Sequence, residues 1–249
     1  DRRQRQMCIR DRSRAIVLRI HKLDDEKRIA EVYTECRGFL SFRISQGGGK
    51  RSKMKSTYFL PLNLLELEYD YRERFPLQTI NELSLLSSMQ MSSFNPYKSA
   101  IILFLSEFLV HILRKEPKNE ELFTFLVDSF EWLERSDTDF PSFHLALVTQ
   151  ITRFLGIPPF MDSYVPGYYF DMQESSFVEM PPVHGVFLAP EYATLLAAMY
   201  RVPYEDMHLL ELSRQDRREY LKILIHYYQL HFPGFTDMKS LTVLSDLFE

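Results

Sequence analysis

A run of twelve residues, Gln46 to Thr57 (QGGGKRSKMKST), carries the side chains best suited to chemistry with an anion. Three consecutive glycines give its backbone wide conformational freedom. Four cations follow the glycines closely: Lys50, Arg51, Lys53 and Lys55. Strand-like sequence flanks the run on both sides, so the pattern predicts a flexible, positively charged loop on a sheet. Such a loop neutralises phosphate charge without reading a base sequence. The alternative interpretation is a hairpin loop that only improves solubility.

The distribution of charge along the chain supports the first interpretation. Residues 1–57 contain 16 of the 30 Lys and Arg residues but only 7 of the 34 Asp and Glu residues. The rest of the chain therefore holds 14 basic residues against 27 acidic ones. This asymmetry predicts an N-terminal module that faces a polyanion and an acidic module with another role.

Further cations lie on the predicted strands beside this loop. The candidate DNA-binding residues among them are Arg14, Arg19, Arg28 and Arg43, with Lys22 and Arg37 in the same region. Aromatic side chains that can stack on bases are Phe39, Phe42, Tyr58 and Phe59. Because side chains alternate along a strand, half of these aromatics must point into the core. Phe39 and Tyr58 suit the core as well as they suit a binding groove.

A second cationic cluster falls on one predicted helix that begins at the cap Ser213. Arg214, Arg218 and Lys222 are spaced i, i+4 and i+8, so they share a face of the helix. Leu221, Ile225 and Tyr228 lie beside them, and cations next to an apolar groove suit an acidic peptide with a hydrophobic end. Pairing within the helix, with Asp216 and Glu219, explains the same cations equally well.

Motifs of catalysis are missing from the sequence. It contains no HExxH, GxSxG, GxGxxG or GxxxxGK[ST] pattern, and its two cysteines, Cys8 and Cys36, form no CxxC pair. His111 and His144 lie on apolar stretches, where a core histidine is expected rather than a ligand. We therefore predict a protein that is not an enzyme and that needs no metal or cofactor. A nuclease would need Asp24, Asp25 and Glu26 to assemble with a distant acid around magnesium.

The positions of these residues depend on an α+β fold with strands first. Residues 1–13 show no periodicity; they are either a basic arm for nucleic acid or an unstructured or appended leader, and the pattern favours the leader. Residues 14–87 predict an OB-fold barrel, because short strands must curl to bury one face. The predicted strands are Arg14–His21, Arg28–Thr34, Gly38–Ser45, Tyr58–Tyr71 and Thr79–Leu86.

Residues 88–249 change to a period of 3.6 and predict an all-α C-terminal domain. The predicted helices run from Asn95 to Arg114, 120–135, from Pro141 to Leu155, 191–201, 213–231 and 238–248. An insert at residues 157–187 is rich in proline and aromatic residues and predicts an ordered loop or short hairpin packed on the bundle. The longest apolar stretch, Ala100 to Leu113, is shorter than the roughly 20 residues that span a bilayer.

Several segments in this order resemble the RecO recombination-mediator family. They are RAIVLRIH at the start of the barrel, the basic loop before LPLNLLELE, then FHLALVTQITRFLGIPP, and SRQDRREYLKILIHYYQLHFPGF with KSLTVL near the end. The resemblance covers nearly the whole span from Arg14 to Phe248. It implies an N-terminal OB fold, a helical C-terminal domain and a role without catalysis.

The resemblance also implies partners. These are single- and double-stranded DNA, the protein RecR, the single-stranded-DNA-binding protein and, indirectly, RecA, which the family helps to load onto gaps; strand annealing accompanies this role. We assign the tail of the single-stranded-DNA-binding protein to the face formed by Arg214, Arg218 and Lys222. A cytoplasmic, nucleoid-associated location follows, with no membrane and with reduced thiols.

One departure from the family pattern concerns the insert. Many members carry a four-cysteine zinc module within the helical domain, whereas residues 157–187 contain no cysteine. We therefore expect a zinc-free variant whose insert is held by aromatic packing. The competing function for the whole chain is a protein-interaction scaffold whose OB-like barrel binds acidic protein surfaces and never nucleic acid.

Overall fold

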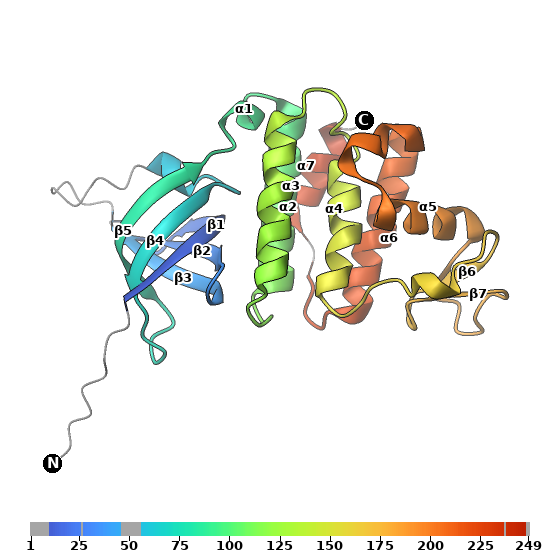
Figure 1. Cartoon of the computed structure of the whole chain (residues 1–249), viewed down its shortest axis with the longest axis horizontal. Coiled ribbons are helices and arrows are strands. Elements are labelled where there is room, and N and C mark those ends of the chain that lie inside the picture. The colour runs from blue at the N-terminus through green and yellow to red at the C-terminus, as the bar shows by residue number, and fades with distance from the viewer. Residues whose placement is uncertain (1–9, 26, 46–55, 237, 248–249) are drawn as a thin grey trace, which may run out of the picture. The chain divides into compact units, whose positions relative to one another are not determined.

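The computed structural model describes residues 10–25, 27–45, 56–236 and 238–247 (Figure 1). Lys50, Arg51, Lys53 and Lys55 lie outside the described residues. The chain forms two compact units. One joins Asp1–Asn95 with Ile102–Phe130, and the other joins Pro96–Ile101 with Glu131–Glu249. The change from strands to helices after Ser87 matches the sequence pattern, but two helices group largely with the barrel.

The first unit contains a closed five-stranded barrel, which confirms the predicted fold class. Its strands are β1 (Arg10–Lys22), β2 (Lys27–Thr34), β3 (Gly38–Ser45), β4 (Leu64–Asp70) and β5 (Gln78–Ser87). The strand order is β1-β2-β3-β5-β4, and β4 pairs with β1 to close the barrel. All neighbours are antiparallel except β3 and β5, which run parallel. This order is that of an OB-like barrel.

Two predicted strand boundaries were wrong. The leader was expected to end at Ser13, but β1 begins at Arg10 because Arg10–Ser13 pair with residues 67–70 of β4. The predicted strand Tyr58–Tyr71 is divided into a 3₁₀ helix, η1 (Ser56–Phe59), and β4. Pro61 and Leu62 turn the chain between them, since Leu62 adopts a φ of 63°, in the left-handed region.

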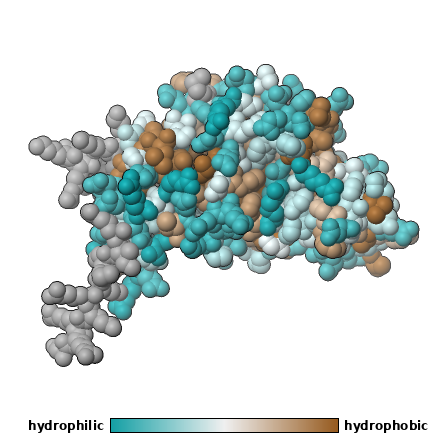
Figure 2. Space-filling view, in the orientation of Figure 1, coloured by the Kyte–Doolittle hydropathy of each residue, from teal (hydrophilic) through white to brown (hydrophobic). Residues whose placement is uncertain are grey.

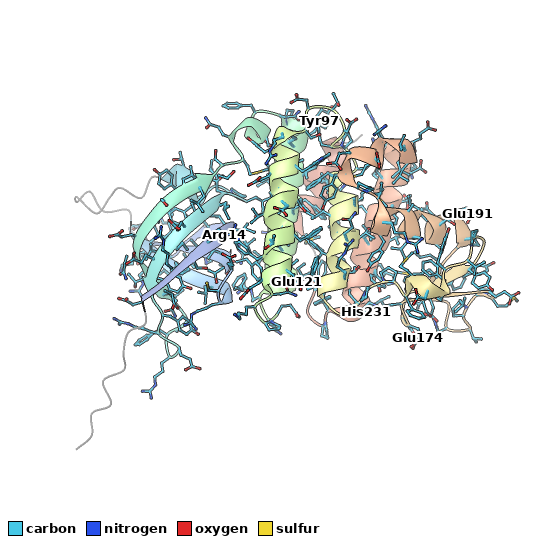
Figure 3. The ribbon with its side chains drawn as sticks, in the orientation of Figure 1. Arg14, Tyr97, Glu121, Glu174, Glu191 and His231 are labelled. Atoms are coloured by element: carbon cyan, nitrogen blue, oxygen red, sulfur yellow. The ribbon has the colours of Figure 1, made fainter. Side chains whose placement is uncertain are left out.

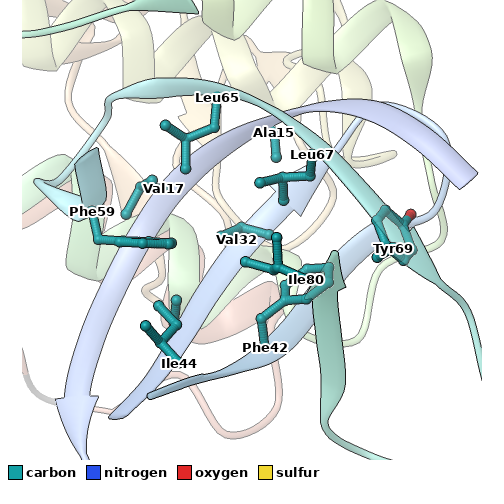
Figure 4. Packing of buried hydrophobic residues seen from close by; sticks show 11 residues of the cluster. Ala15, Val17, Val32, Phe42, Ile44, Phe59, Leu65, Leu67, Tyr69 and Ile80 are labelled. Carbon is teal, nitrogen blue, oxygen red and sulfur yellow. The ribbon is translucent and has the colours of Figure 1, made fainter. Parts of the chain in front are cut away.

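The barrel is filled by side chains that alternate inward along its strands, as Figure 4 shows. From the strands they include Ala15, Val17, Val32, Phe42, Ile44, Leu65, Leu67, Tyr69 and Ile80, and Phe59 joins them from η1. The outward residues Ile16, Leu18 and Tyr33 are also almost fully buried. One outer face of the barrel is therefore covered rather than open to water.

Parts of two helices in the same unit cover that face. They belong to α2 (Pro96–Leu113), which follows the short α1 (Gln90–Ser93), and to α3 (Glu120–Arg135). The Ser106 hydroxyl donates a hydrogen bond to the Leu18 carbonyl, and the Tyr33 ring lies 6.2 Å from that of Phe123. The Asn119 side chain caps α3, as predicted, by accepting a hydrogen bond of 2.9 Å from the Leu122 amide.

α2 is long and apolar enough, by length and composition, to cross a membrane. However, 67% of its 18-residue window is buried inside the protein. Its inward residues include Ile101, Phe104, Leu105 and Phe108. This burial is typical of a core helix, in agreement with the interpretation of the apolar stretch as a buried helix.

The second unit is built around α4 (Phe143–Ile151), all of whose residues are buried. The other helical elements are η2 (Thr152–Phe154), η3 (Met161–Ser163), α5 (Pro190–Arg201), η4 (Tyr204–Leu210), α6 (Arg214–His231) and α7 (Lys239–Leu247). Tyr220 and Tyr228 join α6 to α4, through hydrogen bonds to the Thr149 hydroxyl at 2.9 Å and the Val148 carbonyl at 2.8 Å. The predicted helices lie within a few residues of those observed, but η4 was not predicted.

The insert forms a small sheet of β6 (Tyr169–Asp171), β7 (Ser176–Val178) and β8 (Phe187–Leu188) in the order β7-β6-β8. Its centre is aromatic: the Phe177 ring lies 4.9 Å from that of Phe170 and 5.0 Å from that of Tyr164. Phe170 in turn packs on Tyr227 of α6. His231, labelled in Figure 3, donates a hydrogen bond of 2.8 Å to the Met172 carbonyl. Aromatic packing therefore holds the insert, as expected.

Candidate nucleic-acid interface

The register of the barrel strands sorts the predicted DNA-binding residues. Arg19 pairs with Glu31 and Glu31 with Ser41, while Ile29 pairs with Arg43 in the next row. Arg19 and Arg43 therefore lie on the same outer face of the sheet, because paired residues point the same way. Arg28 does not share this outer face. It pairs with Lys22 and with Ile44, and it lies at one end of the barrel.

Arg14 also points outward, but it is engaged in holding the fold together. Its guanidinium donates two hydrogen bonds to the Glu35 carboxylate, at 2.9 and 2.7 Å, and lies 5.3 Å from the centre of the Phe123 ring. The hydrogen bonds with Glu35 raise the pKa of Arg14 and lower that of Glu35. Figure 3 shows Arg14 on the side of the barrel toward α3.

Arg19 belongs to a cluster of three charged residues. Its Nε donates a hydrogen bond of 2.8 Å to one carboxylate oxygen of Glu31, and a terminal nitrogen lies 2.7 Å from the same oxygen. Arg114, at the end of α2, donates to the other oxygen of the same carboxylate at 2.7 Å. The Glu31 side chain is only 4% exposed, while the side chains of Arg19 and Arg114 are 44% and 47% exposed. One buried carboxylate thus positions two half-exposed guanidinium groups.

The remaining candidates lie at the end of the barrel where β3 finishes. Arg43 is exposed and lies two residues before the last residue of β3, Ser45, after which the basic loop begins. Arg28 lines a shallow depression together with Lys22, Asp24 and Asp25. The two acidic residues balance neighbouring lysines: Lys22 pairs with Asp25 at 2.6 Å and Lys27 with Asp24 at 3.4 Å.

The four aromatic residues predicted to stack on bases lie partly in the core and partly on the surface. Phe42 and Phe59 belong to the buried core, so neither can stack on a base. Phe39 is partly exposed on the outer face, and Arg114 lies 5.1 Å from the centre of its ring. Tyr58 packs partly against the core from η1. Of the four, Phe39 therefore has the best position for contact with a ligand on the outer face.

Other barrel cations are also paired with carboxylates. Arg12 lies 2.7 Å from Glu66, and Arg37 lies 2.5 Å from Asp11 and stacks 3.9 Å from the centre of the Tyr71 ring. Figure 2 shows hydrophilic residues over much of the barrel, and hydrophobic residues over the end of β5, where Leu85 and Leu86 are exposed. The excess of positive charge is therefore smaller in the described barrel than the count of arginines suggests.

Arg114 is a cation of this candidate site that was not predicted from the sequence. In the sequence it is simply a cation that ends an apolar helix, where it is favoured by the helix dipole. Its approach to Glu31, 83 residues earlier in the chain, depends on how α2 packs on the barrel. A local pattern contains no signal for that pairing.

The second predicted cluster lies on α6, as expected, but its surroundings differ. Lys222 is exposed and pairs within the helix with Glu219 at 2.9 Å. Asp216 forms a capping box with Ser213, which lowers the pKa of the Asp216 carboxyl. The apolar neighbours Leu221, Ile225 and Tyr228 are buried in the core, so they offer no groove to a peptide. Arg214 is exposed and Arg218 half-exposed on the same helix.

Within the described ranges, no group of three or more His, Cys, Asp or Glu side chains is placed to hold a metal ion. Asp24 and Asp25 instead form ion pairs with lysines. What this interface can do chemically is bind anions through guanidinium and ammonium groups, since these side chains donate hydrogen bonds and carry charge.

A closed OB-like barrel with arginines on one outer face, followed by a helical body with a small sheet, defines the structural class of this chain. Two family models match its two parts. "Recombination protein O N terminal" matches residues 7–89, and "Recombination protein O C terminal" matches residues 93–241. The chain therefore belongs to the Recombination protein O family, RecO.

Curated relatives agree over almost the full length. The chain is 40% identical over 233 residues to the DNA repair protein RecO of Phocaeicola vulgatus, an alignment that covers 94% of this chain and 97% of the relative. It is 40% identical over 235 residues to the protein of the same name from Bacteroides fragilis, with coverage of 94% and 97%. The RecO of Porphyromonas gingivalis is 34% identical over 243 residues, with coverage of 95% and 98%.

Proposed function

We propose that this protein is a DNA repair and recombination mediator that binds DNA through the outer face of its barrel. The observation that supports this most strongly is the match of both RecO family models, which together span residues 7–241. The relatives named above are DNA repair proteins. The excess of cations in residues 1–57 supplies a physical means of binding a phosphate backbone.

The proposed DNA-binding residues are those of the sequence prediction, with different weights. Arg43 and the loop cations Lys50, Arg51, Lys53 and Lys55 are proposed to contact phosphates first, since Arg43 is exposed at the point where the loop begins. Arg19 lies on the same outer face as Arg43, and Arg28 lies at the same end of the barrel. Arg14 is proposed to act mainly through the fold, because Glu35 and Phe123 engage its guanidinium.

The proposed partners follow from membership of the family. We propose that the protein works with RecR, engages the single-stranded-DNA-binding protein, helps RecA load onto single strands in the cytoplasm and supports strand annealing. Arg214, Arg218 and Lys222 remain the proposed contact for an acidic tail. Without an apolar groove formed by Leu221, Ile225 and Tyr228, that contact would rest on charge alone.

The test of DNA binding is a titration of labelled single strands at two salt concentrations. Binding through phosphates loses affinity steeply as salt rises, because each contact releases counterions. Changing Lys50, Arg51, Lys53 and Lys55 to Glu should weaken binding to every DNA sequence and flatten the salt dependence. An unchanged affinity and salt slope in that variant would exclude the loop as the contact.

The ion pairs of the barrel favour one alternative function. Because Glu31, Glu35 and Glu66 already balance arginines on the outer face, the described barrel keeps little positive charge for a long polyanion. The alternative is a scaffold whose barrel binds acidic patches of protein surfaces and never nucleic acid. This scaffold predicts no binding of single strands at either salt concentration. The same titration therefore separates the two functions.

A further inference from the structure

The cluster of Arg19, Glu31 and Arg114 has the features of an anion-binding site rather than of a simple ion pair. A guanidinium group has five N–H donors. Glu31 accepts one hydrogen bond from Arg19, one of whose terminal nitrogens lies 2.7 Å from the same oxygen, and one from Arg114, so each arginine keeps donors that the carboxylate does not use. The side chains of both arginines are nearly half exposed, whereas Glu31 is almost completely buried.

The two guanidinium groups are held in place from several directions. The carboxylate fixes Arg19 by a two-point contact, and Arg114 is fixed by the second carboxylate oxygen and by the ring of Phe39, 5.1 Å away. A pre-positioned arginine loses less conformational freedom when it binds a phosphate than a free side chain does. The cluster therefore presents its unused donors at little entropic cost.

The charge of the surroundings is compatible with a bound anion. Arg19 and Arg114 balance the carboxylates of Glu31 and nearby Glu107, so the net positive charge of this face comes from Arg43, one row further along the strands. Glu107 and His111 of α2 also lie near; burial lowers the pKa of His111, Glu107 opposes that effect, and Arg19 and Arg114 reinforce it. At neutral pH the group is thus two arginines facing Glu31 and Glu107, with Arg43 beside them.

We propose that Arg19 and Arg114, positioned by Glu31, form a clasp for a backbone phosphate of single-stranded DNA, so that the binding surface extends from the barrel onto α2. This proposal rests on the proposed DNA-binding function and adds one site to it. Glu31 is a positioning residue that touches no DNA. Phe39, beside Arg114, is placed to contact the adjacent sugar or base.

The test measures fluorescence anisotropy of a labelled oligothymidine with the full-length protein at several salt concentrations. Arg19→Gln and Arg114→Gln should each weaken binding and reduce the slope of log K against log salt by about 0.7, the value for one contact to a single strand. Arg12→Gln is the matched control, because Arg12 is also an ion-paired cation of β1 but lies beside β4. Its salt slope should equal that of the wild type.

Two further variants separate positioning from net charge. Glu31→Gln makes the face more positive, so a mere field effect would tighten DNA binding, whereas the clasp predicts weaker binding because the arginines lose their anchor. Arg114→Lys keeps the charge but not the fork of donors, so the clasp predicts weaker binding at an unchanged salt slope. Thermal melting of each variant shows whether the fold is retained.

The outcomes distinguish the clasp from the wider function. If the wild type binds with a steep salt dependence and the Arg19 and Arg114 variants behave like Arg12→Gln, the clasp is wrong and DNA binding stands. Tighter binding by Glu31→Gln would equally overturn the clasp. If the wild type does not bind single strands at any salt concentration, both proposals fail together.

Discussion

At the scale of single residues, His144 couples the stability of the fold to pH. It lies in α4 and is 2% exposed. Burial lowers its pKa to about 3, and the nearby positive charge of Arg217 contributes in the same direction. The folded protein therefore keeps this imidazole neutral at a pH where an unfolded chain would protonate it.

The direction of the pH effect follows from that difference. The pKa of an unfolded histidine is about 6.5, so the unfolded state gains a proton below that pH and the folded state does not until about pH 3. The stabilisation is complete above pH 6.5 and is lost as the pH falls toward 3. At pH 5 the loss is about 2 kcal/mol.

We predict that His144→Gln loses less stability than the wild type between pH 7 and pH 5, because it removes this protonation from the unfolded state. Urea unfolding at the two pH values measures the difference. Exposed His226, changed to Gln, is the control and should follow the wild type. An identical pH dependence in wild type and His144→Gln would show that another group causes the acid sensitivity.

At the scale of elements, Gly38 lies where the turn between β2 and β3 meets the connection between α2 and α3. Its φ is +72°, and a Cβ atom there would lie 3.2 Å from the Cα atom of Lys118 and 3.3 Å from its backbone nitrogen. Two separate requirements therefore demand glycine at this position: the left-handed backbone and the close approach of a second backbone.

The chain offers a matched comparison. Gly156 has a φ of +73°, but no atom lies within 4 Å of the place that a Cβ atom would take, so this position has the first requirement alone. We predict that Gly156→Ala costs about 1 kcal/mol of unfolding free energy and that Gly38→Ala costs clearly more. Chemical denaturation measures the unfolding free energy of the two variants. Equal decreases would show that the α2–α3 connection moves aside for the added Cβ atom without a loss of stability.

A second element, the insert, depends on the hydroxyl of Tyr227. This hydroxyl donates a hydrogen bond of 2.8 Å to the Ile157 carbonyl. It also lies 2.5 Å from the hydroxyl of Ser175. Burial raises the pKa of Tyr227 to about 12, so it stays a donor at any working pH. One side chain of α6 thus secures both the entry of the insert and the turn between β6 and β7.

We predict that Tyr227→Phe loosens the insert by about 1–3 kcal/mol, since it leaves buried polar groups without their partner. Hydrogen exchange of amides in residues 157–187 should accelerate, while exchange in the barrel stays the same. Tyr192→Phe, on half-exposed α5 surface, is the control. Unchanged protection of the insert would show that its rings alone hold it.

At the scale of the whole molecule, the barrel is not complete without parts of the helices. Ile16, Leu18 and Tyr33 point outward from the barrel and are buried, and contacts with Ser106 and Phe123 lie over them. The compact unit accordingly includes Ile102–Phe130. A fragment that ends at Ser87, the boundary expected from the sequence pattern, would expose this apolar face.

We predict that residues 1–87 expressed alone self-associate and unfold at lower urea concentration than the full chain, because an exposed apolar patch promotes association. Sedimentation velocity measures the first effect. The same fragment with Ile16→Thr and Leu18→Thr should associate less. A monomeric fragment as stable as the full-length protein would contradict the role of the helices.

Much of the fold could be predicted because its signals are local. Alternation marked β2, β3 and β5, and the caps Asn119 and Ser213 marked the starts of α3 and α6. The start of β1 was not predicted correctly because its partner strand, β4, is more than 50 residues away in the chain, as the contact of Arg12 with Glu66 shows. The burial of Phe42 and Phe59 was not predicted because an aromatic side chain suits a core and a binding groove equally well.

The candidate site was less predictable for the same reason. A sequence reveals cations but not the carboxylates that neutralise them, and Arg114 reaches Glu31 only through the packing of α2. The basic loop, whose residues lie outside those described, remains a prediction.

The shared carboxylate of Glu31 also has an evolutionary consequence. An arginine beside it serves the fold whether or not DNA is bound, because removing partners from a buried charge is strongly destabilising. We therefore expect relatives that keep the carboxylate to keep its two guanidinium neighbours, and relatives with an uncharged side chain at that position to vary at both arginine positions. Covariation of positions 19, 31 and 114 among relatives would be the inherited signature of this arrangement.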